Sequence, residues 1–121
     1  MGLADQACIP CRGGVPPLAR ERVEKLLAEL EPGWTATHDG TRIERAFQFK
    51  DFAKALAFAN RVGEIAEREG HHPDLHVGWG RCRVEIWTHK INGLTESDFY
   101  LAAKTDLAYQ NLVKTLGYKS A

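Results

Sequence analysis

The sequence has no excess of charge of either sign, because its 121 residues include 16 lysines and arginines against 16 aspartates and glutamates. A neutral chain has no general attraction to the phosphates of nucleic acid or to an anionic membrane surface. The sequence also lacks any run of the ~18–20 consecutive apolar residues that a transmembrane helix needs. We therefore expect neither a nucleic-acid partner nor a membrane partner.

Cysteine is scarce and odd in number, since the chain has only three, and this argues against a secreted disulfide scaffold. Residues 1–6 have neither the basic start nor the apolar run of a secretory signal. Cys8 and Cys11 have the spacing of half a zinc site, but a structural site needs four ligands and a second pair is absent. We expect a cytoplasmic protein in which Cys8 and Cys11 are a loosely held pair, in preference to a metal or redox site.

The composition is that of a globular domain, with 44% hydrophobic and 26% charged residues, and the length suits one domain. Glycine and proline gather at residues 13–17 without any apolar periodicity before them. Such a cluster marks a break in regular structure. The sequence therefore predicts an irregular arm over residues 1–17 and a single domain over residues 18–121.

Hydrophobic periodicity predicts three helices and two hairpins in that domain. The helices are expected at residues 18–30, 52–69 and about 95–116. The strands are expected at residues 34–38 and 42–49, joined by Asp39-Gly40, and at residues 75–79 and 82–89, joined by Gly80-Arg81. This order implies an α+β fold, a four-stranded antiparallel sheet with three helices packed on one face. The other sheet face is then available for self-association or for a binding cleft.

Several single residues carry local expectations. Asp51 is placed to cap the central helix, and Gly70 is placed to end it in a left-handed conformation. Cys82 falls on the apolar face of its strand, and Trp79 continues the face of Leu75 and Val77, so we expect both to pack in the core. Arg45 interrupts an otherwise apolar face, as a residue at a sheet edge or in a functional site would.

Three of the five histidines are grouped by this layout. His71 and His72 lie at the exit of the central helix, and His89 is expected to end the last strand. Glu67 is four residues before His71, so the two side chains would meet if the helix continued that far. Histidines at a helix end or a strand end are often only structural or exposed. Three of them together favour a functional site.

Two kinds of chemistry are open to these histidines. They could bind zinc and leave one position for water, or they could act as general acids and bases, because an unperturbed histidine titrates near neutral pH. No His-Glu-x-x-His helix or other familiar ligand spacing supports the metal. We favour acid/base catalysis, for which these residues alone name no substrate.

The spacing Glu67-x3-His71-His72-Pro73-x5-Trp79-x9-His89-x8-Asp98 resembles the signature of the pterin-4a-carbinolamine dehydratases. The resemblance extends over about residues 18–112, and it is greatest to bacterial members associated with phenylalanine hydroxylase. The fold of that family is an α+β domain of the kind predicted above. His38 and His76 match nothing in the signature, and we assign them to solvated strand faces.

The resemblance implies an enzyme that removes water from a 4a-hydroxytetrahydropterin to give quinonoid dihydropterin, and so recycles the tetrahydropterin of an aromatic amino acid hydroxylase. It implies a homodimer or homotetramer that needs no cofactor and no metal. Animal members also act as dimerisation cofactors of a transcription factor, so a protein-binding module is the alternative. The residues implicated are catalytic His71, His72 and His89, with Glu67, Pro73, Trp87, Thr88 and Asp98 in substrate binding.

Among these residues, His71 and His89 are expected to exchange protons with the substrate, while His72 orients it. Glu67 would hold a histidine ring in its working tautomer, and Trp87 and Thr88 would form part of the pterin pocket. Asp98 lies in the stretch Thr95-Glu96-Ser97-Asp98, a variant of the capping box, so it is expected to cap the last helix and anchor the loop after His89.

Overall fold

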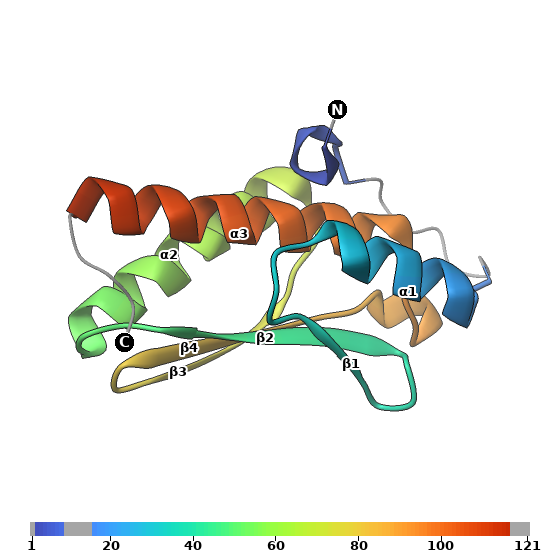
Figure 1. The fold of residues 1–121 in the computed structure, drawn as a ribbon, viewed down its shortest axis with the longest axis horizontal. Coiled ribbons are helices and arrows are strands. Elements are labelled where there is room, and N and C mark those ends of the chain that lie inside the picture. The colour runs from blue at the N-terminus through green and yellow to red at the C-terminus, as the bar shows by residue number, and fades with distance from the viewer. Residues whose placement is uncertain (1, 9–15, 117–121) are drawn as a thin grey trace.

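A computed structural model describes residues 2–8 and 16–116 of the protein, and within them it has the predicted α+β architecture: three α-helices lie on one face of a four-stranded antiparallel sheet (Figure 1). Two short 3-10 helices, η1 and η2, complete the set. In chain order the elements are η1 Leu3–Asp5, α1 Arg20–Glu29, β1 Thr35–Thr37, β2 Arg42–Gln48, α2 Phe52–Glu69, β3 Asp74–Gly78, β4 Arg81–Ile86, η2 His89–Ile91 and α3 Glu96–Leu116.

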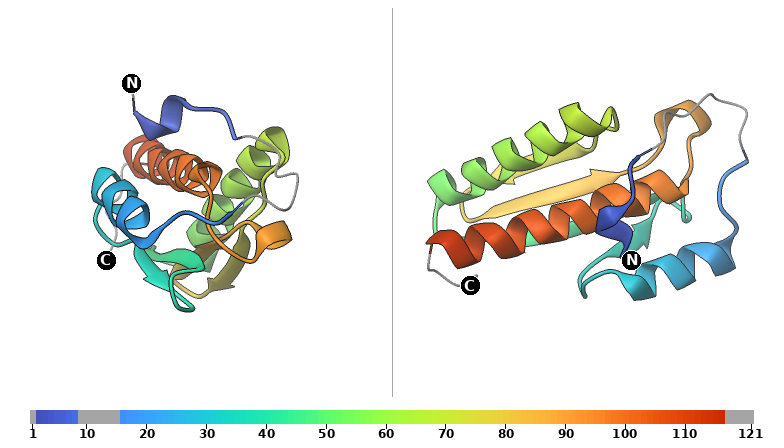
Figure 2. Two further views of the ribbon diagram at one scale, coloured as in Figure 1. Left: turned by 90° about the vertical axis from the view of Figure 1, so that its right-hand side faces the viewer. Right: turned by 90° about the horizontal axis from the view of Figure 1, so that it is seen from above.

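The sheet has the strand order β1-β2-β4-β3, so each predicted hairpin forms and the two hairpins meet along β2 and β4. Ile43 lies opposite Ile86 and Phe47 lies opposite Cys82 across this central pair. All four side chains are buried, because alternate residues of a strand point to the same face and this face is covered by the helices. Seen from above, α2 and α3 lie side by side over the sheet (Figure 2).

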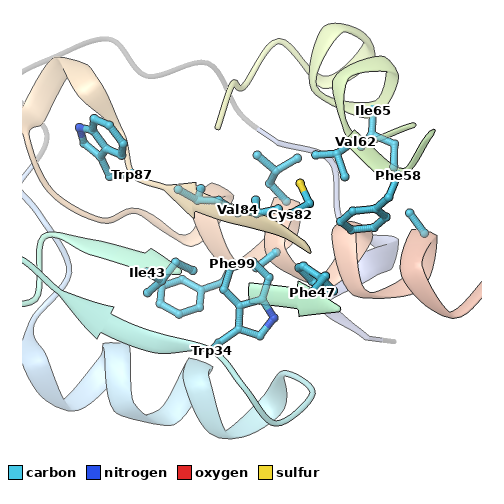
Figure 3. Packing of buried hydrophobic residues seen from close by; sticks show 14 of the residues in the cluster. Trp34, Ile43, Phe47, Phe58, Val62, Ile65, Cys82, Val84, Trp87 and Phe99 are labelled. Carbon is cyan, nitrogen blue, oxygen red and sulfur yellow. The ribbon is translucent and has the colours of Figure 1, made fainter. Parts of the chain in front are cut away.

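The core is richest in aromatic rings where β2, α2 and α3 meet (Figure 3). The Phe47 ring centroid lies 4.7 Å from that of Phe58 and 4.9 Å from that of Tyr109. Burying one such side chain fully contributes about 1.5–3 kcal/mol. Cys82 is fully buried beside them, and burial raises the pKa of its thiol to about 11. The prediction that Cys82 is a core residue is confirmed.

Arg45 interrupts the apolar face of β2 because it pairs with a buried carboxylate of α3. Its Nη1 atom lies 2.7 Å from Asp106 Oδ1, and the Trp34 indole N–H donates to the same carboxylate at 2.9 Å. Burial raises the pKa of Asp106 although the hydrogen bonds from Trp34 and Arg45 act in the opposite direction. The Arg45 guanidinium also lies over the Phe47 ring, 4.4 Å from its centroid. Arg45 therefore joins β2 to α3 and has a structural role.

The residues that begin and end the central helix are those predicted from the sequence. The Asp51 carboxylate accepts a hydrogen bond of 2.9 Å from the Lys54 backbone N–H, which lowers the pKa of Asp51 and caps α2. Gly70 ends α2 in the left-handed region at φ 67°, a conformation that costs glycine little. The first helix begins at Arg20 instead of residue 18, because the backbone of Ala19 is extended at ψ 155°. The Leu18 backbone N–H before it donates to the Leu94 carbonyl oxygen at 2.9 Å.

Three expectations for the second hairpin are wrong: its turn residues, the packing of Trp79 and the end of its return strand. The turn consists of Trp79 and Gly80, since Gly78 pairs with Arg81, and Trp79 is therefore 76% exposed at the hairpin tip instead of packed in the core. The fourth strand ends at Ile86 and not at His89. Thr88 forms an isolated bridge with Gly93, and the chain between them turns through the η2 helix, which contains His89.

Residues 2–8 of the arm lie on α3, on the side away from the sheet (Figure 1). The Ala4 carbonyl oxygen accepts a hydrogen bond of 2.7 Å from Lys104 Nζ, and the Cys8 backbone N–H donates to Glu69 Oε1 at 3.0 Å. Burial, together with the negative charge of Glu69, raises the pKa of the Cys8 thiol to about 12. Cys8 is thus firmly packed and not loosely held, while Cys11 lies outside the described residues.

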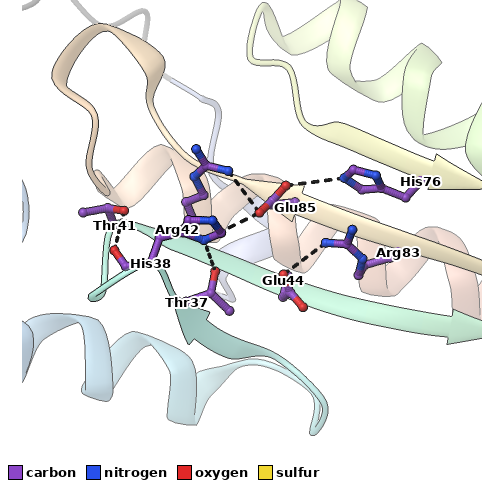
Figure 4. Close-up of polar contacts among 8 residues, drawn as sticks. All are labelled: Thr37, His38, Thr41, Arg42, Glu44, His76, Arg83 and Glu85. Carbon is purple, nitrogen blue, oxygen red and sulfur yellow. Dashed lines mark hydrogen bonds and ion pairs between the residues drawn. The ribbon is translucent and has the colours of Figure 1, made fainter.

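The sheet face away from the helices is polar (Figure 4). Glu85 lies near its centre, only 5% exposed, and accepts hydrogen bonds from Arg42 Nη1 at 3.2 Å and from His76 Nε2 at 3.4 Å. Burial alone would raise the pKa of Glu85, but the hydrogen bonds from Arg42 and His76 hold it below its ordinary value. Arg83 and Glu44 form a second pair at 3.2 Å. No helix in the described part of the chain is both long and apolar enough for a transmembrane span.

We expect Asp106→Ala to lower the free energy of unfolding by about 3 kcal/mol, because it leaves the Arg45 charge and the Trp34 N–H without their partner in the interior. Urea denaturation followed by circular dichroism measures this change. The control is Glu64→Ala, which breaks the exposed Arg61–Glu64 pair and should cost less than about 0.5 kcal/mol. Equal effects of the two substitutions would contradict the assigned role of Asp106.

We expect the stabilisation due to Glu85 to disappear at acid pH. A carboxyl group whose pKa is lower in the folded than in the unfolded protein stabilises the fold above the unfolded pKa, and this contribution is lost as the pH falls through the folded pKa. Glu85→Gln should therefore be less stable than the parent at neutral pH, and the difference should narrow between about pH 6 and pH 3. Denaturant midpoints over this range test the prediction, with the exposed Glu64→Gln as control.

Candidate active site

A cavity of about 230 Å³ opens where the end of α2 meets the loop after β4. Its lining residues include all three histidines of the predicted site and two of the expected substrate-binding residues. They are Gly70, His71, His72, Trp87, Thr88, His89 and Lys90. Gly70 and Lys90 were not expected from the sequence, although each adjoins a predicted site residue.

Gly70 sets the direction in which the two adjacent histidines leave the helix. Because its backbone is left-handed at φ 67°, the chain reverses, and the His71 N–H bonds to the Ala66 carbonyl oxygen at 3.2 Å. His71 then points inward and is 9% exposed, whereas His72 is exposed. Pro73 continues the chain into β3 and is not among the lining residues of the cavity.

The side chain of His71 is held by a buried carboxylate. Its Nε2 atom lies 2.6 Å from Asp98 Oδ1, and Asp98 is completely buried. The other oxygen of Asp98 accepts hydrogen bonds of 2.8 Å from the Thr88 hydroxyl and of 2.8 Å from the Thr95 backbone N–H. The Thr95 contact is half of a capping box, so the helix-capping role expected for Asp98 is present. The contact with His71 was not expected.

The side chain of His72 is held by Glu67, not by Asp98. Its Nε2 atom lies 2.6 Å from Glu67 Oε2, and both side chains are largely exposed. The proposed meeting of Glu67 with His71 does not occur, because α2 ends before His71 could complete another turn. A carboxylate only accepts hydrogen bonds, so in both pairs Nε2 carries the proton when the imidazole is neutral, and Nδ1 is left as the basic nitrogen.

His89 differs from the other two, because its neighbour is an aromatic ring. It is exposed on η2, and its imidazole stands perpendicular to the Trp87 indole with 4.1 Å between the ring centroids. Trp87 is 9% exposed and lies apart from Phe47 and Phe58, at one end of the core (Figure 3). Thr88 is buried and lies 3.1 Å from the Thr95 hydroxyl, in addition to its bond to Asp98.

The described residues contain one group of three side chains whose ligand atoms lie close enough to hold a metal ion, within 4.8 Å of one another: Asp74, His76 and Glu85. This group lies on the outer sheet face, and the Glu85 carboxylate already binds Arg42. The three pocket histidines do not form such a group. The zinc hypothesis for His71, His72 and His89 therefore gains no support from their arrangement.

A larger cavity of about 650 Å³ lies between α1 and the turn after β1. Its titratable side chains include His38 and Asp39, which have left-handed backbones at φ 53° and 57° in that turn. His38 therefore lies in a turn and not on a strand. This cavity holds none of the predicted site residues, so the chemistry expected from the sequence is confined to the smaller one.

Comparison with known proteins assigns the chain to a family. The family model described as "Pterin 4 alpha carbinolamine dehydratase" matches residues 16–108. The chain belongs to this family. Relatives named for the same family include one from Rickettsia bellii, 54% identical over 87% of this chain and 92% of the relative. A relative from Methylococcus capsulatus is also 54% identical, over 86% of this chain and 90% of its own length.

Solved structures of the family agree with the fold. The crystal structure of a Brucella melitensis protein, described as a "transcriptional coactivator/pterin dehydratase", is 32% identical with a TM-score of 0.72 and covers 78% of this chain and 99% of that one. A "pterin dehydratase-like protein" described as a RuBisCO assembly factor is 20% identical with a TM-score of 0.56, over 64% and 89% of the two chains. At that identity the likeness shows the fold alone.

We expect Asp98→Asn to destabilise the protein and to disturb the dehydratase-family pocket, because a carboxamide has one acceptor oxygen where three donors converge. Leaving a buried donor unpaired should lower the free energy of unfolding by about 2 kcal/mol. Thermal and urea unfolding measure the change. Asp51→Asn is the matched control, since asparagine caps a helix about as well as aspartate. Similar small losses from both substitutions would contradict a special role for Asp98.

Proposed function

We propose that the protein dehydrates 4a-hydroxytetrahydropterin to quinonoid dihydropterin by histidine general acid/base catalysis. The observation that carries this proposal is the histidine group around one cavity, in which His71 and His72 are each held by a carboxylate at 2.6 Å. Membership of the pterin carbinolamine dehydratase family supplies the substrate class.

The reaction requires two proton transfers. The C4a–O bond breaks as the hydroxyl group takes up a proton and leaves as water, while the neighbouring ring nitrogen loses its proton and its electron pair forms the C=N bond. The nitrogen lone pair already assists loss of the hydroxyl group, so neither a metal nor a covalent nucleophile is needed. An imidazolium and a neutral imidazole suit these two transfers, and each contributes on the order of 10²–10⁴-fold as general acid or base.

His71 is the better candidate for the base that takes the ring-nitrogen proton. The buried Asp98 carboxylate lies against its Nε2 atom, and a negative charge there stabilises the imidazolium that forms when Nδ1 accepts a proton. His89 is exposed and can exchange its proton with water between turnovers, as an acid that protonates the leaving hydroxyl must. His72, oriented by Glu67, completes the lining and directs the substrate.

Trp87 and Thr88 supply the walls against which a flat heterocycle binds. Both line the cavity and both are buried, so their positions change little when the pocket is filled. Thr88 is fixed by its bond to Asp98 at 2.8 Å. Pro73 acts indirectly, because the residue before a proline is restricted to extended conformations and this limits how His72 is presented.

The product is a quinonoid dihydropterin, which must be reduced before a hydroxylase can use it again. We therefore place the protein beside an aromatic amino acid hydroxylase, with phenylalanine hydroxylase as the first choice, as a cytoplasmic homodimer or homotetramer. The polar outer sheet face is the surface that the helices leave open for such assembly.

A second candidate function is that of a protein-binding coactivator, which the description of the Brucella melitensis structure favours. Such a role would act through a protein partner, because the chain has no net positive charge with which to bind nucleic acid. Co-purification with a helical dimerisation segment, from a protein whose pocket histidines had been replaced, would separate this function from catalysis.

We expect His71→Gln and His89→Ala each to lower the catalysed rate by about 10²-fold or more. The assay follows loss of the 4a-carbinolamine produced by a hydroxylase, with and without the protein. Glutamine at position 71 keeps a donor for Asp98, so the fold should survive. The control is Glu64→Ala, exposed on α2 and absent from the cavity lining, which should leave the rate unchanged. Parent-like rates in both pocket variants would refute histidine catalysis.

A further inference from the structure

Trp87 contacts two charged or titratable groups that come from different elements of the fold. The guanidinium carbon of Arg42 lies 3.9 Å from the centroid of the indole ring. The His89 imidazole lies 4.1 Å from the indole, centroid to centroid, with the rings perpendicular. Arg42 comes from β2 and His89 from η2. The indole therefore connects the pocket with the polar residues of the outer sheet face, which we call the outer-face network: Arg42, Glu44, His76, Arg83 and Glu85.

Arg42 is itself held in place by the outer-face network (Figure 4). Its Nη1 atom donates to Glu85 Oε2 at 3.2 Å, and Glu85 is 5% exposed. The Arg42 Nε atom is buried without a hydrogen-bond partner among the described residues. A buried donor without a partner carries a desolvation cost. The Arg42 side chain therefore lacks one hydrogen bond in the position where its guanidinium contacts the indole.

The orientation of His89 depends on a ring contact, whereas the orientations of the other two pocket histidines depend on carboxylates. His71 and His72 each have a carboxylate 2.6 Å from Nε2. Among the described residues, the His89 side chain makes its ring contact with Trp87. An exposed imidazole can rotate about its side-chain bonds, and a buried perpendicular ring beside it limits that rotation.

We propose that Arg42 is a positioning residue for His89 and acts through Trp87. Glu85 fixes the guanidinium, the guanidinium holds the indole by a cation–π contact, and the indole holds the imidazole in the orientation that proton transfer to the substrate needs. This inference rests on the proposed dehydratase function for its effect on rate. The orientation of His89 can be tested without any activity.

The test compares Arg42→Gln with Arg83→Gln. Both residues lie on the outer face and pair with a glutamate at 3.2 Å, and glutamine keeps a donor for that glutamate, but only Arg42 lies over Trp87. Two quantities are measured for each variant: kcat and KM for 4a-carbinolamine loss, and the ring resonances of His89 in the NMR spectrum of the ligand-free protein. Arg42→Lys, which keeps the cation, is the conservative variant.

We expect Arg42→Gln to lower kcat about fivefold to tenfold, with KM changed less than about twofold, because loss of a partly buried cation–π contact corresponds to factors of this order. The His89 resonances should shift, since the imidazole lies beside the ring current of Trp87. Arg83→Gln should leave kcat within about twofold of the parent and the His89 resonances unshifted. Arg42→Lys keeps a cation next to the indole and should lose less of kcat than Arg42→Gln.

Two results would overturn the inference: parent-like His89 resonances in Arg42→Gln, whatever its kcat, or an equal loss of kcat in the Arg83 control. If Arg42→Gln fails to fold, Arg42→Met, which keeps the length of the side chain without its charge, replaces it, with the same loss of kcat and shift of His89 expected. If the parent has no dehydratase activity, the proposed function fails, while the His89 resonances still decide whether Arg42 positions this histidine.

Discussion

The candidate site depends on one buried charge, the carboxylate of Asp98. A carboxylate removed from water must have donors on its oxygens, and here they come from His71 after α2, Thr88 after β4 and Thr95 before α3. The end of α2 and the loop that joins β4 to α3 therefore have to meet at one point for the charge to be tolerated. The cavity forms beside that point. The need to surround the Asp98 carboxylate with donors therefore also sets the geometry of the site.

Gly70 gives the two adjacent histidines different surroundings. The left-handed backbone directs His71 to a buried carboxylate and leaves His72 to an exposed one. The two contacts between a histidine and a carboxylate have the same length of 2.6 Å but different surroundings, because solvent screens the pair of Glu67 and His72 and hardly reaches the other. The buried pair is thus the one able to influence proton transfer strongly.

The elements were predictable because hydrophobic spacing reports directly which residues face the core, and it placed both hairpins and all three helices of the described chain. The errors occur where a short turn decides direction. Trp79 could not be distinguished from a strand residue until the turn was known to consist of Trp79 and Gly80. The contact of Arg42 with Trp87 requires the register between β2 and the chain after β4, which no local pattern contains.

Inside the fold, two buried carboxylates are each paired with an arginine. Arg45 neutralises the buried Asp106, and Arg42 neutralises the nearly buried Glu85. Asp98 has no arginine or lysine partner among the ion pairs of the described chain and faces a histidine instead. An arginine partner is always charged, whereas a histidine can gain and lose a proton near neutral pH. The fully buried carboxylate of Asp98 is therefore in contact with a residue type that can exchange protons, as the proposed acid/base chemistry requires.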